Sequence, residues 1–179
     1  KKPLESLSDF HNLKIRSAAN PGQINAWKAA GLSPVPLAWG EIYTSLQQGL
    51  IQGQESAIDS IYTQRFYEVQ KYLSLTEHMY SNHVLFTNVE FWSSLTEQEK
   101  KLVRNAIGKF ITNQRDLADK QNKATLSKLK SEGVKVNIVS AETRQQLKTA
   151  LNSAIAEEIE AKTGVELYNF VMQKTDSLR

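Results

Sequence analysis

The amino-acid sequence predicts an α/β fold, in which short strands alternate with helices and long helices follow. Over 12–17 and 134–138, apolar residues alternate with polar ones, which is typical of a strand with one buried face. Between Thr96 and Lys130, apolar residues recur three, four or seven positions apart, which is typical of an amphipathic helix. Strand and helix patterns that take turns along a chain indicate a sheet covered by helices.

The first predicted strand buries Leu13 and Ile15 on one face. A helix is expected to start at Asn20 and Pro21, because asparagine caps free amide groups and proline suits the first helical turn. Gly31 is placed to end this helix, since glycine readily adopts the left-handed conformation found past helix ends. The sequence therefore opens with a strand followed directly by a helix.

The segments up to residue 88 continue the alternation. Prolines make 33–38 extended and favour an edge strand, because proline cannot donate a backbone hydrogen bond. A helix is expected over 41–48, and a second short strand over 50–55. The apolar side of 58–70 predicts a further helix. We interpret 71–88 as strands that run between two lobes.

The second half of the chain is predicted to be mainly helical. Thr96 and Glu99 form a capping box that begins a long helix, which should run to about Lys130. Its expected core face consists of Val103, Ile107, Phe110, Leu117 and Ala124. A strand over 134–138 and a helix capped by Ser140 follow. The core-facing residues expected in that helix and the last one are Leu147, Leu151, Ile155, Ile159, Val165, Phe170 and Met172.

Composition excludes several classes of function. The 179 residues carry a net charge of +3, and the basic residues are scattered, whereas nucleic-acid binding concentrates them on one face. The absence of cysteine rules out disulfides, thiolate metal sites and cysteine catalysis. No apolar run approaches the ~20 residues that span a bilayer. The first ten residues lack the apolar core of a signal peptide, so an exported protein would carry its signal upstream.

No residue set in the sequence suggests catalysis or metal binding. His78 and His83 are five residues apart, a spacing that matches neither a helix face nor a strand face, and a third ligand is not evident. Glycine-rich phosphate loops and the G-x-S-x-G nucleophile motif are absent, and we interpret the matches to S-x-x-K at 127–130 and K-T-G at 162–164 as coincidences of helix-end sequence. We therefore expect no enzyme activity, no cofactor, no metal and no nucleic-acid partner.

Arg16 is the first candidate for a binding residue. It ends the first predicted strand and precedes the small residues 17–19. In open α/β sheets this place faces a crevice outside the strand ends, where ligands bind. A guanidinium offers a planar fork of donors that matches a carboxylate. On these grounds alone, the alternative of a surface or salt-bridging arginine remains open.

Several motifs resemble the solute-binding proteins of tripartite ATP-independent periplasmic (TRAP) transporters. The segment L-K-I-R ends at Arg16, and P-x-P-x-A precedes Trp39. The pattern E-[VI]-Y-x-[AS]-L-Q-x-G is matched from Glu41 to Gly49, and G-Q-E occupies 53–55. The resemblance covers nearly the whole chain. It implies an α/β periplasmic-binding-protein-like lobe with crossing strands and long C-terminal helices, as part of a two-lobe fold.

The resemblance also implies roles for particular residues. Arg16 would pair with a ligand carboxylate, and Trp39 would pack beside the ligand. Ser56 stands where the family usually has a ligand-contacting asparagine, so its shorter side chain would reach the ligand less directly. For the tyrosine and the histidine of the remaining candidates, a structural role stays open beside a ligand contact. These candidates are Ala19, Tyr62 and His83.

In function, the resemblance implies a periplasmic receptor that binds an organic acid and delivers it to TRAP membrane subunits. Residues 1–88 would form the second ligand-binding lobe with its crossing strand. Residues 89–179 would form long helices and a strand that pack back on an N-terminal lobe, absent here. The chain is therefore expected to be partial and to expose apolar helix faces. The alternative is a sensor or partner-binding module, in which the long helix carries the partner surface.

Overall fold

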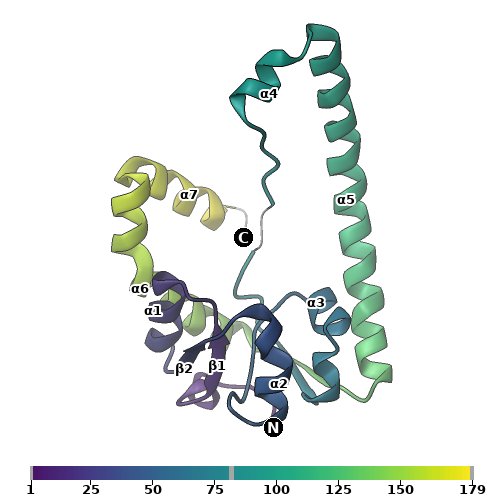
Figure 1. The fold of residues 1–179 in the computed structure, drawn as a ribbon. Helices are drawn as coiled ribbons and strands as arrows, with labels where there is room; N and C mark the ends of the chain where they lie inside the picture. Colours follow the sequence, from purple (N-terminus) through teal and green to yellow (C-terminus); the bar gives the residue numbers. More distant parts are fainter. Residues whose placement is uncertain (1, 81–82, 178–179) are drawn as a thin grey trace.

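The computed structural model describes residues 2–80 and 83–177, and it places two small parallel sheets among helices (Figure 1). Its elements up to the second sheet are η1 (Leu7–Phe10), β1 (Lys14–Ser17), α1 (Pro21–Ala29), β2 (Ser33–Pro36), η2 (Trp39–Glu41), α2 (Ile42–Gln47), α3 (Ile58–Thr63), η3 (Phe66–Glu68) and β3 (Tyr72–Leu75). The later elements are α4 (Val89–Ser94), α5 (Glu97–Ser131), β4 (Lys135–Ile138), α6 (Ala141–Thr163) and α7 (Val165–Ser177). The α/β class predicted from the sequence is confirmed.

The first sheet pairs β1 with β2 in parallel, with α1 as the connection between them. The predicted second strand over 50–55 is wrong: only Gly53 bridges to Ile15, on the other side of β1. The amides of Gln52 and Gly53 both donate to the carbonyl of Lys14, at 2.7 and 3.1 Å. Two successive amides that share one acceptor break the regular ladder, so the segment touches β1 without extending the sheet.

The second sheet pairs β3 with β4, also in parallel. Between β3 and β4 in the chain, α4 lies away from both sheets, and α5 runs from the region of α4 back to the rest of the structure (Figure 1). Within 71–88 only Tyr72–Leu75 forms a strand, so the predicted strand further along the segment is wrong for the described residues 83–88. Val84, Leu85 and Phe86 are exposed. No described segment pairs with their backbone, and a strand needs such a partner.

The single helix predicted over 58–70 is also wrong. The structure divides it into α3 and the 3-10 helix η3, separated by Arg65 in the left-handed conformation with φ of 57°. The amide of Arg65 donates to the carbonyl of Tyr62, which closes the end of α3. This break turns Phe66 inward, and Phe66 is among the most buried side chains of the described residues.

Two clusters of buried apolar residues pack against the two sheets. In the first, α1 and α6 pack together, with Trp27, Leu147 and Leu151 buried between them. The second lies under α2 and α3 and reaches the C-terminal end of α5, where Leu129 is 0% exposed. The N-terminal segment fastens to the second sheet, since the Asn137 side chain donates to the carbonyl of Leu4 at 2.8 Å.

The core face predicted for α5 is not buried in this chain. Phe110 is 62% exposed and Leu117 is 61% exposed, and Ala124 is exposed as well. The buried residues of α5 are Thr125 and Leu129 instead, because only the last turns of the helix lie against the body of the structure (Figure 1). Of the predicted residues, Val103 and Ile107 are half-buried.

The last two helices are likewise covered only in part. Leu147 and Leu151 of α6 are buried as predicted, and Ile155 packs against the same cluster, whereas Ile159 lies at the margin of exposure. In α7 the apolar residues Val165, Leu167, Phe170 and Val171 are exposed. Apolar faces therefore remain open on both arms of the structure, α4–α5 and α7.

Candidate functional site

Arg16 is held at the carboxyl-terminal end of β1 by contacts on three sides. Its amide donates to the carbonyl of Gly53 at 2.9 Å, and its Nε donates to the carbonyl of Leu37 at 3.1 Å. The guanidinium carbon lies 5.6 Å from the centre of the Trp39 ring, a cation–π contact. Nε is the guanidinium atom for which a hydrogen bond is found within 2–80 and 83–177. The terminal nitrogens therefore keep donors for a ligand.

Trp39 begins the 3-10 helix that follows β2. The Glu41 carboxylate accepts from the amide of Ala38 at 2.9 Å, which fixes the turn before the ring. The ring meets Phe66 edge to face, with 5.9 Å between the ring centres, and stays 42% exposed. Trp39 thus has one neighbour in the core, another in Arg16, and a surface open to solvent.

A polar network that the sequence did not reveal lies beside Arg16. The carboxylate of Glu55 accepts from Nε2 of Gln23 at 3.0 Å. Its other oxygen lies 3.5 Å from Nε2 of His78, longer than an ordinary hydrogen bond. The His78 ring shares a hydrogen bond of 2.7 Å with Thr76 and meets Trp27 edge to face. Both ionisable side chains are largely buried.

The environment of Glu55 favours its charged form. The contact with His78 is the largest influence and lowers the pKa of the Glu55 carboxyl below its ordinary value, although burial acts in the opposite direction. The bond from Gln23 and the positive charge of Arg16 lower this pKa further. The surface beside Arg16 therefore holds one cation, Arg16 itself, and one carboxylate, Glu55, which is already paired.

The candidates Ala19 and Ser56 lie in the two loops that flank Arg16. Ala19 is exposed in the turn between β1 and α1. Ser56 is half-buried, and its hydroxyl donates within its own loop, to the side chain of Gln54 at 2.6 Å and to the carbonyl of Glu55. The structure thus brings Arg16, Trp39 and the loops that carry Ala19 and Ser56 to one end of the first sheet.

Tyr62 and His83 lie elsewhere. Tyr62 stacks on Tyr67 with 5.5 Å between ring centres, and Nζ of Lys128 lies 5.4 Å from its ring. These contacts join α3 to α5 in the second cluster. His83 is exposed on the segment that leads to α4. Within the described ranges, no hydrogen bond, ion pair or ring contact joins either residue to Arg16 or Trp39.

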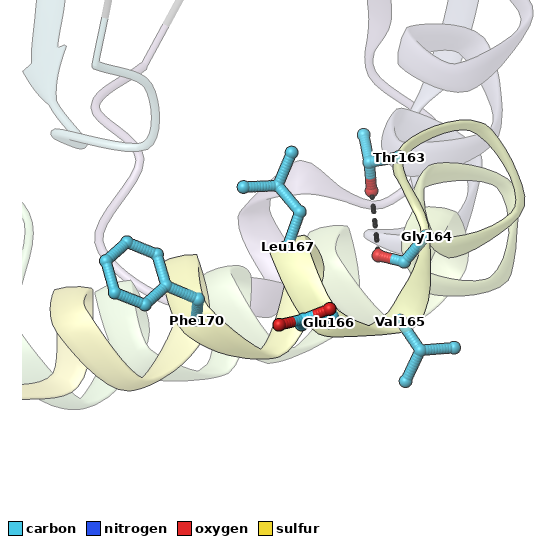
Figure 2. A pocket seen from close by; sticks show the side chains of 6 residues that line it. All are labelled: Thr163, Gly164, Val165, Glu166, Leu167 and Phe170. Carbon is cyan, nitrogen blue, oxygen red and sulfur yellow. Dashed lines mark hydrogen bonds between the residues drawn. The ribbon is translucent and has the colours of Figure 1, made fainter.

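A hollow of about 500 Å³ lies at the elbow between α6 and α7, apart from this site (Figure 2). Its lining is mostly apolar and exposed, and the hydroxyl of Thr163 donates to the carbonyl of Gly164 within it. The lining residues are Thr163, Gly164, Val165, Glu166, Leu167 and Phe170. It contains no cation to match an acid, so Arg16 remains the better candidate.

Two further properties of the described residues bear on function. Across 2–80 and 83–177, no group of three or more His, Cys, Asp or Glu side chains is placed to hold a metal ion. No helix in the same ranges has both the length and the apolar character that crossing a membrane requires.

Comparison with known proteins identifies the family. Residues 1–162 match the model of the bacterial extracellular solute-binding proteins, family 7, also called DctP. The chain belongs to this family. Family 7 proteins are solute-binding receptors rather than enzymes, and the relatives matched include periplasmic proteins of TRAP transporters. The family resemblance drawn from the sequence motifs is confirmed.

Named relatives show how much of a family 7 protein this chain represents. The sialic acid-binding periplasmic protein SiaP of Vibrio cholerae is 31% identical over 165 residues, which are 90% of this chain and 51% of that protein. The sugar acid-binding protein of Advenella mimigardefordensis, solved with galactonate, matches with a TM-score of 0.85 at 28% identity. The match covers 100% of this chain and 57% of that one.

A third match has the highest identity of these three. The TRAP periplasmic solute-binding protein of Polaromonas sp. JS666, solved with D-erythronate, is 34% identical with a TM-score of 0.81. It covers 96% of this chain and 55% of that chain. The chain thus spans about half the length of the relatives it matches. The predicted fold class, a periplasmic-binding-protein-like lobe that forms part of a two-lobe fold, is confirmed.

Proposed function

We propose that this chain is part of a periplasmic receptor that binds an organic acid through Arg16 and delivers it to TRAP membrane subunits. The observation that carries the proposal is the guanidinium of Arg16. It is half-buried at the end of β1, fixed by the Leu37 carbonyl and the Trp39 ring, and keeps donors that no described residue uses. Such a fork suits a carboxylate.

The surroundings of Arg16 strengthen this interaction. Trp39 is placed to cover a bound acid and to exclude water, which lowers the local dielectric and makes the ion pair stronger. Glu55 is already paired with His78 and Gln23, so it competes less for the guanidinium. The ligand then becomes the main anionic partner of Arg16.

The ligands of the relatives support an acid. Their names and solved complexes give sialic acid, galactonate and D-erythronate, which are all hydroxylated carboxylic acids. A polyhydroxylated acid would use Arg16 for its carboxylate. The loops that carry Ala19 and Ser56 would contact its hydroxyl groups. Tyr62 and His83 would not contact the acid directly and would affect binding only by supporting the segments in which they lie.

The other half of the receptor would cover the open apolar faces. We propose that 1–88 belongs to the second ligand-binding lobe and that 89–179 packs back on an N-terminal lobe. The exposed residues of α5 and α7 support this division, because exposed apolar patches of this kind mark interfaces. Closure of two lobes is a hinge motion, and the acid favours the closed form by contacting both.

The test is a binding screen of the full-length receptor against galactonate, D-erythronate and sialic acid, with galactose as a neutral analogue. Arg16→Ala should weaken acid binding about thirtyfold or more. Arg16→Lys should recover only part of the affinity, because lysine lacks the fork. Arg115→Ala, an exposed arginine of α5, is the matched control. Equal binding by the parent and Arg16→Ala would overturn the proposal.

The exposed face of α5 also favours a second candidate, a sensor or partner-binding module that does not serve transport. This module would bind its partner through Phe110 and Leu117 and would be indifferent to Arg16. The same screen separates the two functions. A receptor loses acid binding with Arg16→Ala, whereas a module binds no acid and loses its partner with Phe110→Asp.

A further inference from the structure

Gln23 joins the two loops that flank Arg16. Its Oε1 accepts from the amide of Ala18, in the loop after β1, at 3.1 Å, and from the hydroxyl of Ser17, the last residue of β1, at 3.3 Å. Its Nε2 donates to Glu55 at 3.0 Å, in the loop after Gly53. One amide side chain thus uses its acceptor on one loop and its donor on the other.

The start of α1 orients this side chain. Gln23 is the third residue of the helix, and its amide donates to the side chain of Asn20, the N-cap, at 3.1 Å. Pro21 restricts the backbone between them. Because the helix start is fixed by both residues, the Gln23 side chain reaches the loops from a rigid base.

We propose that Gln23 is a positioning residue of the binding site, which locks the 17–20 and 53–56 loops into one rim around Arg16. Gln23 itself does not touch the ligand. The inference rests on the proposed function, since it assigns the rim to acid binding. It goes beyond that function by naming the residue that fixes the geometry.

Two chemical features of glutamine make the lock specific. An acceptor is needed for the Ala18 amide, and a donor is needed for Glu55. Glutamate supplies only the acceptor and adds a charge beside Glu55, and methionine has the size but supplies neither. The charged groups around this point are Glu55, His78 after β3, Arg16 on β1, and Glu158 of α6, which approaches Gly22.

The experiment compares Gln23→Met and Gln23→Glu in the full-length receptor, with Gln146→Met and Gln146→Glu as controls on the exposed face of α6. Galactonate affinity is measured by calorimetry at pH 5.5 and pH 8, and exchange of the Ala18 amide is followed by NMR. Gln23→Met should weaken binding by about tenfold and speed Ala18 exchange. Gln23→Glu should keep Ala18 protected and lose affinity at both pH values, because an ordinary glutamate pKa of about 4.3 leaves both carboxylates charged from pH 5.5 to pH 8.

Different outcomes separate this inference from the proposed function. If Gln23→Met binds galactonate as the parent does, the positioning role is wrong while the receptor function stands. If galactonate, D-erythronate and sialic acid all fail to bind the parent, the proposed function fails. In that case only the hydrogen exchange of the Ala18 amide tests whether Gln23 fixes the two loops. An exchange rate in Gln23→Met equal to that of the parent would overturn the inference. A melting temperature that drops equally in Gln23→Met and Gln23→Glu, with affinity unchanged, would show a structural role only.

Discussion

The C-terminal end of α5 and its middle lie in opposite surroundings. At its C-terminal end, Leu129 is buried in the cluster under α2 and α3, whereas further up, Phe110 and Leu117 of the same helix are exposed. Around Arg16, in contrast, most polar groups have partners within the chain. The surroundings of Arg16 are therefore held largely by contacts within the chain, whereas the arms α4–α5 and α7 carry exposed apolar faces, which our proposal assigns to a further partner.

Altering the buried end of α5 should change the stability of the protein most. Leu129→Ala should destabilise the protein by about 2–5 kcal/mol, because it leaves a cavity in a packed core. Leu117→Ala in the same helix should change the stability of the 179-residue chain by less than about 0.5 kcal/mol. Urea unfolding measures both.

The same two substitutions in the full-length receptor test whether another lobe covers α5. If another lobe covers the face of α5, the cost of Leu117→Ala should rise above about 1 kcal/mol there. A small cost in both contexts would show that the face stays in water, and the packing proposed for 89–179 would then fail.

A pair of glycines gives the next largest effect. Gly31 has φ of 85°, and an added Cβ would lie 2.3 Å from the His11 ring. Gly31→Ala should therefore cost about 1–3 kcal/mol through backbone strain and crowding. Gly108, inside α5, has no atom within 4 Å of an added Cβ. Gly108→Ala should stabilise the helix by about 0.5–1 kcal/mol. Thermal unfolding of the two variants should shift in opposite directions.

The acid limb of the stability profile tests the Glu55 network. Because folding lowers the pKa of Glu55, its charged form contributes stability that is complete above the ordinary glutamate pKa, about 4.3. This contribution should be lost as the pH falls below that value through the lowered pKa. Glu55→Gln should remove this part of the pH dependence, and Glu166→Gln, on the exposed start of α7, is the control. An unchanged profile in Glu55→Gln would show that the network does not stabilise the fold.

Those candidate site residues that belong to contiguous motifs could be proposed from the sequence. Arg16 and Trp39 were found because each ends a recognisable segment, and their cation–π contact brings these segments together. Gln23, Glu55 and His78 were missed as a group, because parallel pairing and loops bring them together across long sequence separations. No periodicity marks such a cluster. A glutamine three residues after a capping asparagine is the one local signal that could have indicated Gln23.

The fold was predictable to a similar extent. Alternation and the prolines of 33–38 located the strands of both sheets. Capping located the start of α5, where Thr96 and Glu99 cap the helix as expected. Periodicity also found the apolar face of α5 but could not say what covers it, so a face expected in the core is exposed. The break at Arg65 was missed because arginine carries no signal for a left-handed conformation.

The smallest expected effect concerns the surface of α6 near the elbow. Nζ of Lys162 pairs with Glu158 one turn earlier, at 2.5 Å, and the lysine is well exposed. Such a pair on a helix contributes only about 0.3–0.5 kcal/mol, because water and salt screen it. Lys162→Ala should therefore change the unfolding free energy by that amount or less in low salt and by almost nothing in 1 M salt. A larger, salt-resistant loss would mean that the elbow is covered by another part of the receptor, since only a desolvated charge pair keeps its strength in salt.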